Sequence, residues 1–149
     1  MKQSAGILPC KKEDGWKVFL VHMGGPYWKN KERAWSIVKG EINEGEDPLE
    51  AAKREFYEET GERIEGDFLP IGSVKSSNKK ITAWAVEASP STDIVSNTFE
   101  IEWPPKSGKT ERFPEVDRAG WFTIDEAEKI IVRSQLPFLK RVRSLLGSD

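Results

Sequence analysis

Three glutamates at helical spacing, Glu55, Glu58 and Glu59, are the residues of this sequence best suited to chemistry. At about 100° per residue, an α-helix places their side chains on one arc of about 100°. Carboxylates this close repel one another unless a cation lies between them. Their oxygens are also the ligands that Mg²⁺ and Mn²⁺ prefer. The spacing alone fits a solvated acidic helix face and a divalent-metal site equally well.

The helix that would carry these glutamates has clear ends in the sequence. Asp47 is typical of an N-cap, Pro48 suits the first helical position, and Glu50 completes a capping-box pattern. Gly61 is typical of the residue that follows a helix. The sequence therefore predicts a helix from position 47 to about position 60, with an apolar face beside the acidic arc.

Further strands and helices are indicated by alternating apolar residues and by turn residues. The pair Asp14-Gly15 predicts a hairpin turn. We expect strands near 4–11, 16–23, 34–38, 67–76, 80–88, 97–103 and 119–123, helices over 124–133 and from 137 onward, and loops over 24–33 and 104–113. Paired strands with one early helix and two late helices predict an α/β fold, in which a mixed sheet has helices on both faces.

Length and composition limit the class of protein. The 149 residues are enough for one domain, expected over 1–149, and 37% of them are hydrophobic. The single cysteine excludes an internal disulfide and fits a reducing, cytoplasmic setting, and the single histidine excludes a multi-histidine metal site. No apolar run reaches the roughly 20 residues of a membrane span, so we expect no membrane partner.

The charge is unevenly distributed along the chain. The net charge is −2, yet positions 40–62 hold nine acidic and two basic residues, which gives −7 there and +5 elsewhere. A mildly basic remainder is not the footprint of a polybasic nucleic-acid surface. We therefore expect a small nucleotide as partner and no long nucleic acid. The sequence does not predict an oligomeric state.

The wider pattern around the glutamates resembles a known signature. Gly40 is followed after five residues by Glu46, and seven residues later positions 54–61 read REFYEETG. This is similar to the signature of the Nudix hydrolases, G-x5-E-x7-R-E-U-x-E-E-x-G-U, where U is a bulky apolar residue. The last position departs, because Glu62 replaces an apolar residue. The flanking segments 34–40 and 115–122 also resemble the family.

The resemblance implies a Nudix-type α/β/α sandwich and hydrolysis of a pyrophosphate linkage in a nucleoside diphosphate joined to another group. It implies that Glu55, Glu58 and Glu59, together with the carbonyl of Gly40 or its neighbour, ligate Mg²⁺ or Mn²⁺. It also implies that Arg54 orients a glutamate through a salt bridge. Divalent ions neutralise phosphate charge and lower the pKa of bound water, which suits attack on phosphorus.

Other candidates lie outside this signature. Glu115 occupies the region where members of the family place an extra catalytic carboxylate, although an ordinary loop glutamate fits there too. In the loop 24–33, rings can stack on a base and lysines can meet phosphates, or the loop can be a plain surface turn. We therefore include as candidates for substrate binding Tyr27, Trp28, Lys29 and Lys39.

Two classes of function remain open on the sequence. The first is a magnesium-dependent pyrophosphohydrolase, with nucleoside triphosphates or dinucleoside polyphosphates as substrates. The alternative is a non-catalytic Nudix module that senses a nucleotide and regulates a partner, against which the intact signature argues. An enzyme acting on RNA would need an added basic surface or RNA-binding domain, for which the chain has no evident room.

Overall fold

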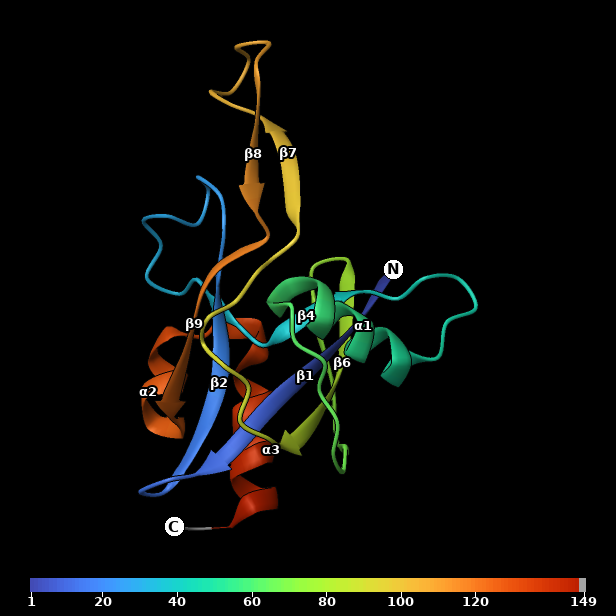
Figure 1. Ribbon diagram of the computed structural model, residues 1–149, viewed down its shortest axis with the longest axis vertical. Coiled ribbons are helices and arrows are strands. Elements are labelled where there is room, and N and C mark those ends of the chain that lie inside the picture. Colours follow the sequence, from blue (N-terminus) through green and yellow to red (C-terminus); the bar gives the residue numbers. More distant parts are fainter. Residues whose placement is uncertain (148–149) are drawn as a thin grey trace.

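The computed structural model describes residues 1–147 (Figure 1). Its strands, in chain order, are β1 (Lys2–Lys12), β2 (Trp16–Met23), β3 (Trp35–Ser36), β4 (Val38–Glu41), β5 (Leu69–Ser76), β6 (Lys79–Glu87), β7 (Thr98–Glu102), β8 (Thr110–Pro114) and β9 (Val116–Thr123). Its helices are α1 (Pro48–Thr60), α2 (Ile124–Ile130), the 3₁₀ turn η1 (Arg133–Gln135) and α3 (Leu136–Leu146). None of these described helices has the length and apolarity needed to cross a membrane.

A mixed sheet of seven strands forms the centre of the molecule. Strand β1 pairs in parallel with β6 along Lys2–Cys10 and in antiparallel fashion with β4 and β2. The β1–β2 pairing is confined to the hairpin end, at Cys10–Lys12, whereas β2 pairs with β9 along Lys17–Met23. Because β1 and β2 diverge beyond their hairpin, their outer ends leave space for the site described below.

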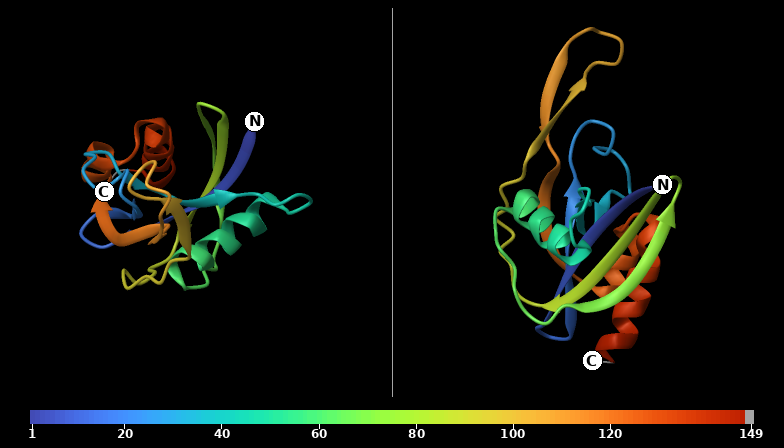
Figure 2. Two further views of the ribbon diagram at one scale, coloured as in Figure 1. Left: turned by 90° about the horizontal axis from the view of Figure 1, so that it is seen from above. Right: turned by 90° about the vertical axis from the view of Figure 1, so that its right-hand side faces the viewer.

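Helices cover both faces of this sheet (Figure 2). On one face α1 packs its buried Phe56 against Phe19, with the ring centroids 6.1 Å apart. On the other face α2 and α3 lie together, and α3 buries Phe138 and Leu139. Two apolar clusters, one on each side of the sheet, therefore hold the layers together. The predicted mixed sheet with helices on both faces is confirmed as an α/β/α sandwich.

Helix α1 begins and ends where the sequence predicts. The Asp47 side chain accepts a hydrogen bond from the Glu50 backbone N–H at 3.2 Å, and Pro48 is the first helical residue. Gly61 has a φ of 81° and donates its N–H to the Tyr57 carbonyl, which closes the last turn. Local capping signals thus fix the position of the acidic residues along the helix.

Two expectations about strands differ from the structure. The strand expected over 34–38 is interrupted at Ile37, because its N–H donates to the Gln135 side chain at 3.0 Å rather than to a neighbouring strand. The segment 104–113, expected as a loop, contains part of β8, which pairs with β7. The β7–β8 hairpin forms a separate two-stranded sheet that extends from the body (Figure 1).

Candidate active site

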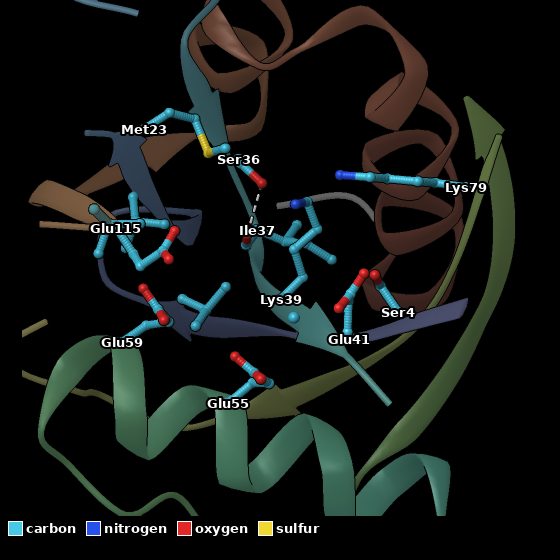
Figure 3. A pocket seen from close by; sticks show the side chains of 14 residues that line it. Ser4, Met23, Ser36, Ile37, Lys39, Glu41, Glu55, Glu59, Lys79 and Glu115 are labelled. Atoms are coloured by element: carbon cyan, nitrogen blue, oxygen red, sulfur yellow. Dashed lines mark hydrogen bonds between the residues drawn. The ribbon is translucent and has the colours of Figure 1, made fainter. Parts of the chain in front are cut away.

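A cavity of about 310 Å³ opens between α1, β4 and the connection from β8 to β9 (Figure 3). Helix α1 contributes Glu55 and Glu59, and Glu115 approaches from the opposite side. Lys39 and Lys79 supply positive charge to the same cavity. Glu41 of β4 lines the cavity as well, so residues from distant parts of the chain gather four carboxylates and two ammonium groups in one concave site, the arrangement typical of ligand-binding sites.

The Arg54 side chain organises the acidic residues behind this cavity. Its guanidinium carries five N–H groups, and all five meet an oxygen. Two of them form a bidentate pair with Glu46, at 2.8 and 3.0 Å, and one donates to the Glu41 carbonyl at 2.9 Å. The other two donate to Glu55 Oε1 and Glu58 Oε2, both at 2.8 Å. A fully satisfied guanidinium of this kind fixes its carboxylate partners in place.

These contacts give the glutamates of α1 different surroundings. Glu55 shares one oxygen with Arg54, and its carboxylate lies against the Gly40 Cα at the cavity wall. Glu58 also pairs with Arg54 but does not line the cavity. Burial is the main cause of the raised pKa of Glu55. The hydrogen bond from Arg54 and its positive charge oppose this rise. Of these two glutamates that pair with Arg54, only Glu55 therefore lines the cavity.

Glu59 is the most deeply placed of these carboxylates, with only 7% of its surface exposed. The Ser96 hydroxyl lies 3.1 Å from its Oε2. Burial, followed by repulsion from Glu115 and Glu55, raises the pKa of Glu59 to about 8. At neutral pH this environment disfavours the ionised form of the Glu59 carboxyl group. A cation that enters the cavity stabilises that ionised form.

Backbone contacts hold Glu115 at the other side of the cavity. Its N–H donates to the Asn97 carbonyl at 2.8 Å, and its own carbonyl accepts from the Gly24 N–H at 2.9 Å. Burial raises the pKa of the Glu115 carboxyl, and the nearby Lys39 charge opposes that rise. A half-buried carboxylate opposite the helix is suitably placed to accept a proton.

Gly40 is required by the close approach of α1. A Cβ atom built at this position would collide with the Glu55 carboxylate. We expect Gly40→Ala to displace that carboxylate, to leave the fold intact, and to lower turnover by about a hundredfold, because a group misplaced by about 1 Å in a preorganised site has effects of this order. Steady-state kinetics and a thermal melt measure both effects.

The test of this mechanism is a double-mutant cycle with Glu55→Gln. If Gly40→Ala acts through the Glu55 carboxylate, it adds little to the loss that Glu55→Gln causes alone. Independent and fully additive losses would show that Gly40 acts in another way.

The ring-bearing loop lies beside this cavity and does not line it. Tyr27 is 54% exposed, and its ring meets that of Trp103 edge-on, with the centroids 5.6 Å apart. The Lys31 ammonium lies over the Trp28 ring at 5.1 Å. Of the four candidates for substrate binding, Lys39 thus lines the cavity together with the carboxylates, whereas Tyr27, Trp28 and Lys29 do not line it.

The donor set suits a hard divalent cation. Among the residues that the structure describes, no three acidic or histidine side chains already form a closed metal cluster. The carboxylates of Glu55, Glu59 and Glu115 nevertheless share one cavity, and their mutual repulsion contributes to the raised pKa of Glu59. Carboxylate oxygens are the ligands that Mg²⁺ and Mn²⁺ prefer, so the residues present fit such an ion.

Further residues of the site were not predicted from the sequence, Lys79 and Ser96 among them. Lys79 begins β6 and lines the cavity, and Ser96 contacts Glu59 from the connection before β7. The sequence pattern assigned a role in the site to neither of them. A lysine at the start of a strand and a serine in a loop are ordinary surface residues in a sequence, and only the tertiary fold places them here.

Comparisons with known proteins identify the family of this chain. The NUDIX domain model matches residues 1–142. An RNA pyrophosphohydrolase from Rhizobium meliloti strain 1021 is 46% identical over 48 residues, which are 32% of this chain and only 29% of that protein. An RNA pyrophosphohydrolase from Brucella anthropi is 32% identical over 145 residues, which cover 85% of this chain and 75% of that protein.

A solved structure shows the same fold. An Ap4A hydrolase from C. elegans, crystallised as a binary complex, superposes with a TM-score of 0.69 over 98% of each chain, at 18% sequence identity. The match of the domain model to nearly the whole sequence and the relative from Brucella anthropi both bear out the resemblance of the sequence signature. The chain belongs to the Nudix family.

Proposed function

We propose that this protein hydrolyses a pyrophosphate linkage in a nucleotide, a nucleoside diphosphate joined to another group, with the help of Mg²⁺ or Mn²⁺. One observation carries the proposal: Glu55, Glu59 and Glu115 face one cavity from two sides. The coarser part, pyrophosphate hydrolysis of nucleotides, is also supported by family relatives whose names describe such reactions. The metal and the individual roles rest on the site alone.

In this proposal Glu55 and Glu59, with the Gly40 carbonyl, hold the metal. Arg54 is a positioning residue, because it fixes one oxygen of Glu55 and leaves the other directed to the cavity. Glu58 serves as an outer ligand, through the oxygen that Arg54 does not bind. The bound metal neutralises phosphate charge and makes water a better nucleophile. Glu115 accepts the proton that the attacking water loses.

The experiment that tests the proposal is a panel of nucleotides incubated with Mg²⁺ and analysed for products. The panel contains nucleoside triphosphates, dinucleoside polyphosphates, ADP-ribose and an oligoribonucleotide with a 5′-triphosphate. RNA is included because several relatives are named RNA pyrophosphohydrolases. Release of pyrophosphate or of a nucleoside monophosphate, abolished by a chelator, supports the proposal. No turnover of any member favours the non-catalytic, nucleotide-sensing alternative.

Divalent metal is expected to stabilise the protein against heat. A ligand that binds only the native state stabilises it by RT ln(1 + [L]/Kd), or about 2.7 kcal/mol at a hundred times Kd. For a domain of this size that corresponds to a rise in melting temperature of roughly 5–10 °C. The cation relieves the repulsion among Glu55, Glu59 and Glu115, which is the physical source of the gain.

The melt is measured with MgCl₂ in large excess over the protein, against NaCl of equal ionic strength, so that a response reports specific binding rather than ionic strength. An equal melting temperature in both salts would contradict a preformed metal site. Glu65→Gln changes an exposed glutamate whose one ion pair within residues 1–147 is with Lys53, and it is a matched control that should keep the full response to Mg²⁺.

A further inference from the structure

Strand β9 carries one extra residue opposite β2, close to the point where it meets the cavity of the candidate active site. The pairing is regular as far as His22, which lies opposite Arg118, but the next residue, Met23, lies opposite Val116. One step along β2 therefore corresponds to two steps along β9, and Asp117 is the residue left over. This arrangement is a β-bulge, which bends a strand and redirects the side chains that follow it.

The bulge decides which side chain of β9 packs under α1. Trp121 and Ala119 alternate toward the apolar cluster on the α1 side of the sheet, and regular alternation would place residue 117 there next. Val116 occupies that place instead and is buried. A regular strand would exchange the directions of Val116 and Glu115. Because of the bulge, the apolar side chain joins the core and the carboxylate opens into the cavity (Figure 3).

The His22 imidazole holds the extra residue in place. Its Nδ1 lies 2.9 Å from Asp117 Oδ1, and since an ionised carboxylate only accepts hydrogen bonds, Nδ1 is the donor. The His22 side chain is only 6% exposed, and its ring packs edge-on against Trp35 with the centroids 5.3 Å apart. Release of Asp117 would leave a buried donor without its partner, which is unfavourable. The pair therefore fixes the bulge at one position along β9.

A second contact of Asp117 contributes less. The Arg118 Nε lies 3.6 Å from the same Oδ1, and both of these side chains are exposed to solvent. Exposed ion pairs of this kind add little stability, because water screens them. The buried His22 is thus the stronger partner of the bulge.

Backbone contacts connect the bulge to two carboxylates of the site. The Val116 N–H donates to Ser96 Oγ at 3.2 Å, and the same hydroxyl lies 3.1 Å from Glu59 Oε2. On the β2 side, the Gly24 N–H donates to the Glu115 carbonyl at 2.9 Å. A movement of the bulge would therefore reach both sides of the cavity.

We propose that His22 and Asp117 are positioning residues, whose hydrogen bond fixes the β9 bulge and thereby holds Glu115 in the direction from which it serves the reaction. This assignment rests on the proposed function. Neither His22 nor Asp117 is among the residues that line the cavity, so both act through the backbone of β9.

Two substitutions of His22 separate its hydrogen bond from its packing. His22→Phe keeps a ring against Trp35 and removes Nδ1, whereas His22→Asn loses the ring and keeps an N–H donor near the position of Nδ1. His22→Phe should lower kcat about tenfold to 100-fold with little change in KM, because a catalytic group displaced by about 1 Å costs about 100-fold. His22→Asn should retain most of the wild-type kcat. Equal losses in the two variants would assign His22 to packing and overturn the proposal.

Asp117 offers the same test from the exposed side of the pair. Asp117→Ala removes the acceptor and Asp117→Asn keeps one. Because the Asp117 side chain is 39% exposed, both variants should fold. Asp117→Ala should match His22→Phe, and Asp117→Asn should resemble the wild type. A wild-type kcat in Asp117→Ala would overturn the proposal.

The matched control is Arg118→Met, which removes the exposed partner of Asp117 and keeps an apolar side chain beside Trp35. Its kcat should change less than about twofold. In a double-mutant cycle, His22→Phe should add almost nothing to the loss caused by Glu115→Gln, since it acts through that carboxylate. Fully additive losses would show that His22 acts elsewhere and would overturn the assignment.

Hydrogen exchange tests the same contact without a substrate, because the Gly24 amide reports directly on the Glu115 carbonyl. Exchange of this amide should be about tenfold faster in His22→Phe, since loss of a hydrogen bond to a charged group changes a local opening equilibrium by about this factor. It should be unchanged in His22→Asn and Arg118→Met. Unchanged exchange in His22→Phe would overturn the proposal.

These measurements separate this inference from the proposed function. If the wild type hydrolyses no nucleotide, the hydrolase proposal fails, and exchange of the Gly24 amide still decides whether His22 holds Glu115. If nucleotides are hydrolysed and His22→Phe keeps the wild-type kcat, the positioning role fails and the hydrolase stands.

Discussion

Replacing Glu59 by glutamine is expected to abolish turnover and, at the same time, to raise the melting temperature of the metal-free protein. The loss of activity is expected to be a factor of about 1,000, since an essential metal ligand is removed. The gain in stability follows from burial and from the neighbouring Glu115 and Glu55 charges, which raise the pKa of Glu59 to about 8 in the folded state. A neutral amide has the same shape and none of this cost.

The raised pKa of Glu59 determines how the stability gain of Glu59→Gln depends on pH. A carboxyl group with a raised pKa binds its proton more tightly in the folded than in the unfolded protein. Its contribution to stability is fully present below the unfolded value of 4.5 and is lost as the pH rises toward about 8. The advantage of Glu59→Gln in the absence of metal should therefore be small at pH 5 and about 5 °C at pH 8.

Thermal melts at both pH values, with a chelator and with Mg²⁺, measure this reversal. Mg²⁺ should stabilise the wild type and leave Glu59→Gln almost unchanged. The exposed variant Glu65→Gln should behave as wild type in every arm. Wild-type turnover in Glu59→Gln at saturating Mg²⁺ would exclude this residue as a metal ligand, and equal melting temperatures without metal would exclude the buried charge as a source of instability.

Features set by local sequence were predictable, as helix α1 shows. An N-cap, a proline in the first turn and a following glycine act within a few residues, so Asp47, Pro48 and Gly61 define the helix without knowledge of the rest of the chain. The signature on this helix also led to the family and to the layered fold. The positions of Glu55 and Glu59 at the cavity follow from this helix and its apolar face.

Features that depend on contacts between distant segments of the chain were harder to predict from the sequence. Strand β8 reads as a polar segment, and only its pairing with β7 makes it a strand. The shared arc grouped three glutamates as ligands, yet Glu55 and Glu59 line the cavity and Glu58 does not. Lys79 enters the site because β6 pairs in parallel with β1, which brings together segments more than 70 positions apart. Helical spacing carries no information about such contacts.

Glu115→Gln is expected to lower kcat about 100-fold with little change in KM. Helix α1 supplies carboxylates from one side of the cavity, and Glu115 faces them from the other side (Figure 3). A group that accepts a proton during attack on phosphorus contributes mainly in the transition state, with effects of about 100-fold to 10,000-fold. The lower limit applies because other carboxylates in the cavity accept the proton less efficiently when Glu115 is absent.

The shape of the pH profile distinguishes this role from a merely structural one. Burial raises the pKa of Glu115, which Lys39 only partly opposes, so the fraction that can accept a proton grows as the pH increases through that raised value. The wild-type kcat should therefore rise with pH on its acid side, and Glu115→Gln should flatten that limb. Glu111→Gln, which removes an exposed carboxylate from the adjacent β8, is the control and should keep the wild-type profile. An unchanged kcat for Glu115→Gln across the whole pH range would show that Glu115 is not the proton acceptor. A carboxylate of α1 would then be assigned that role.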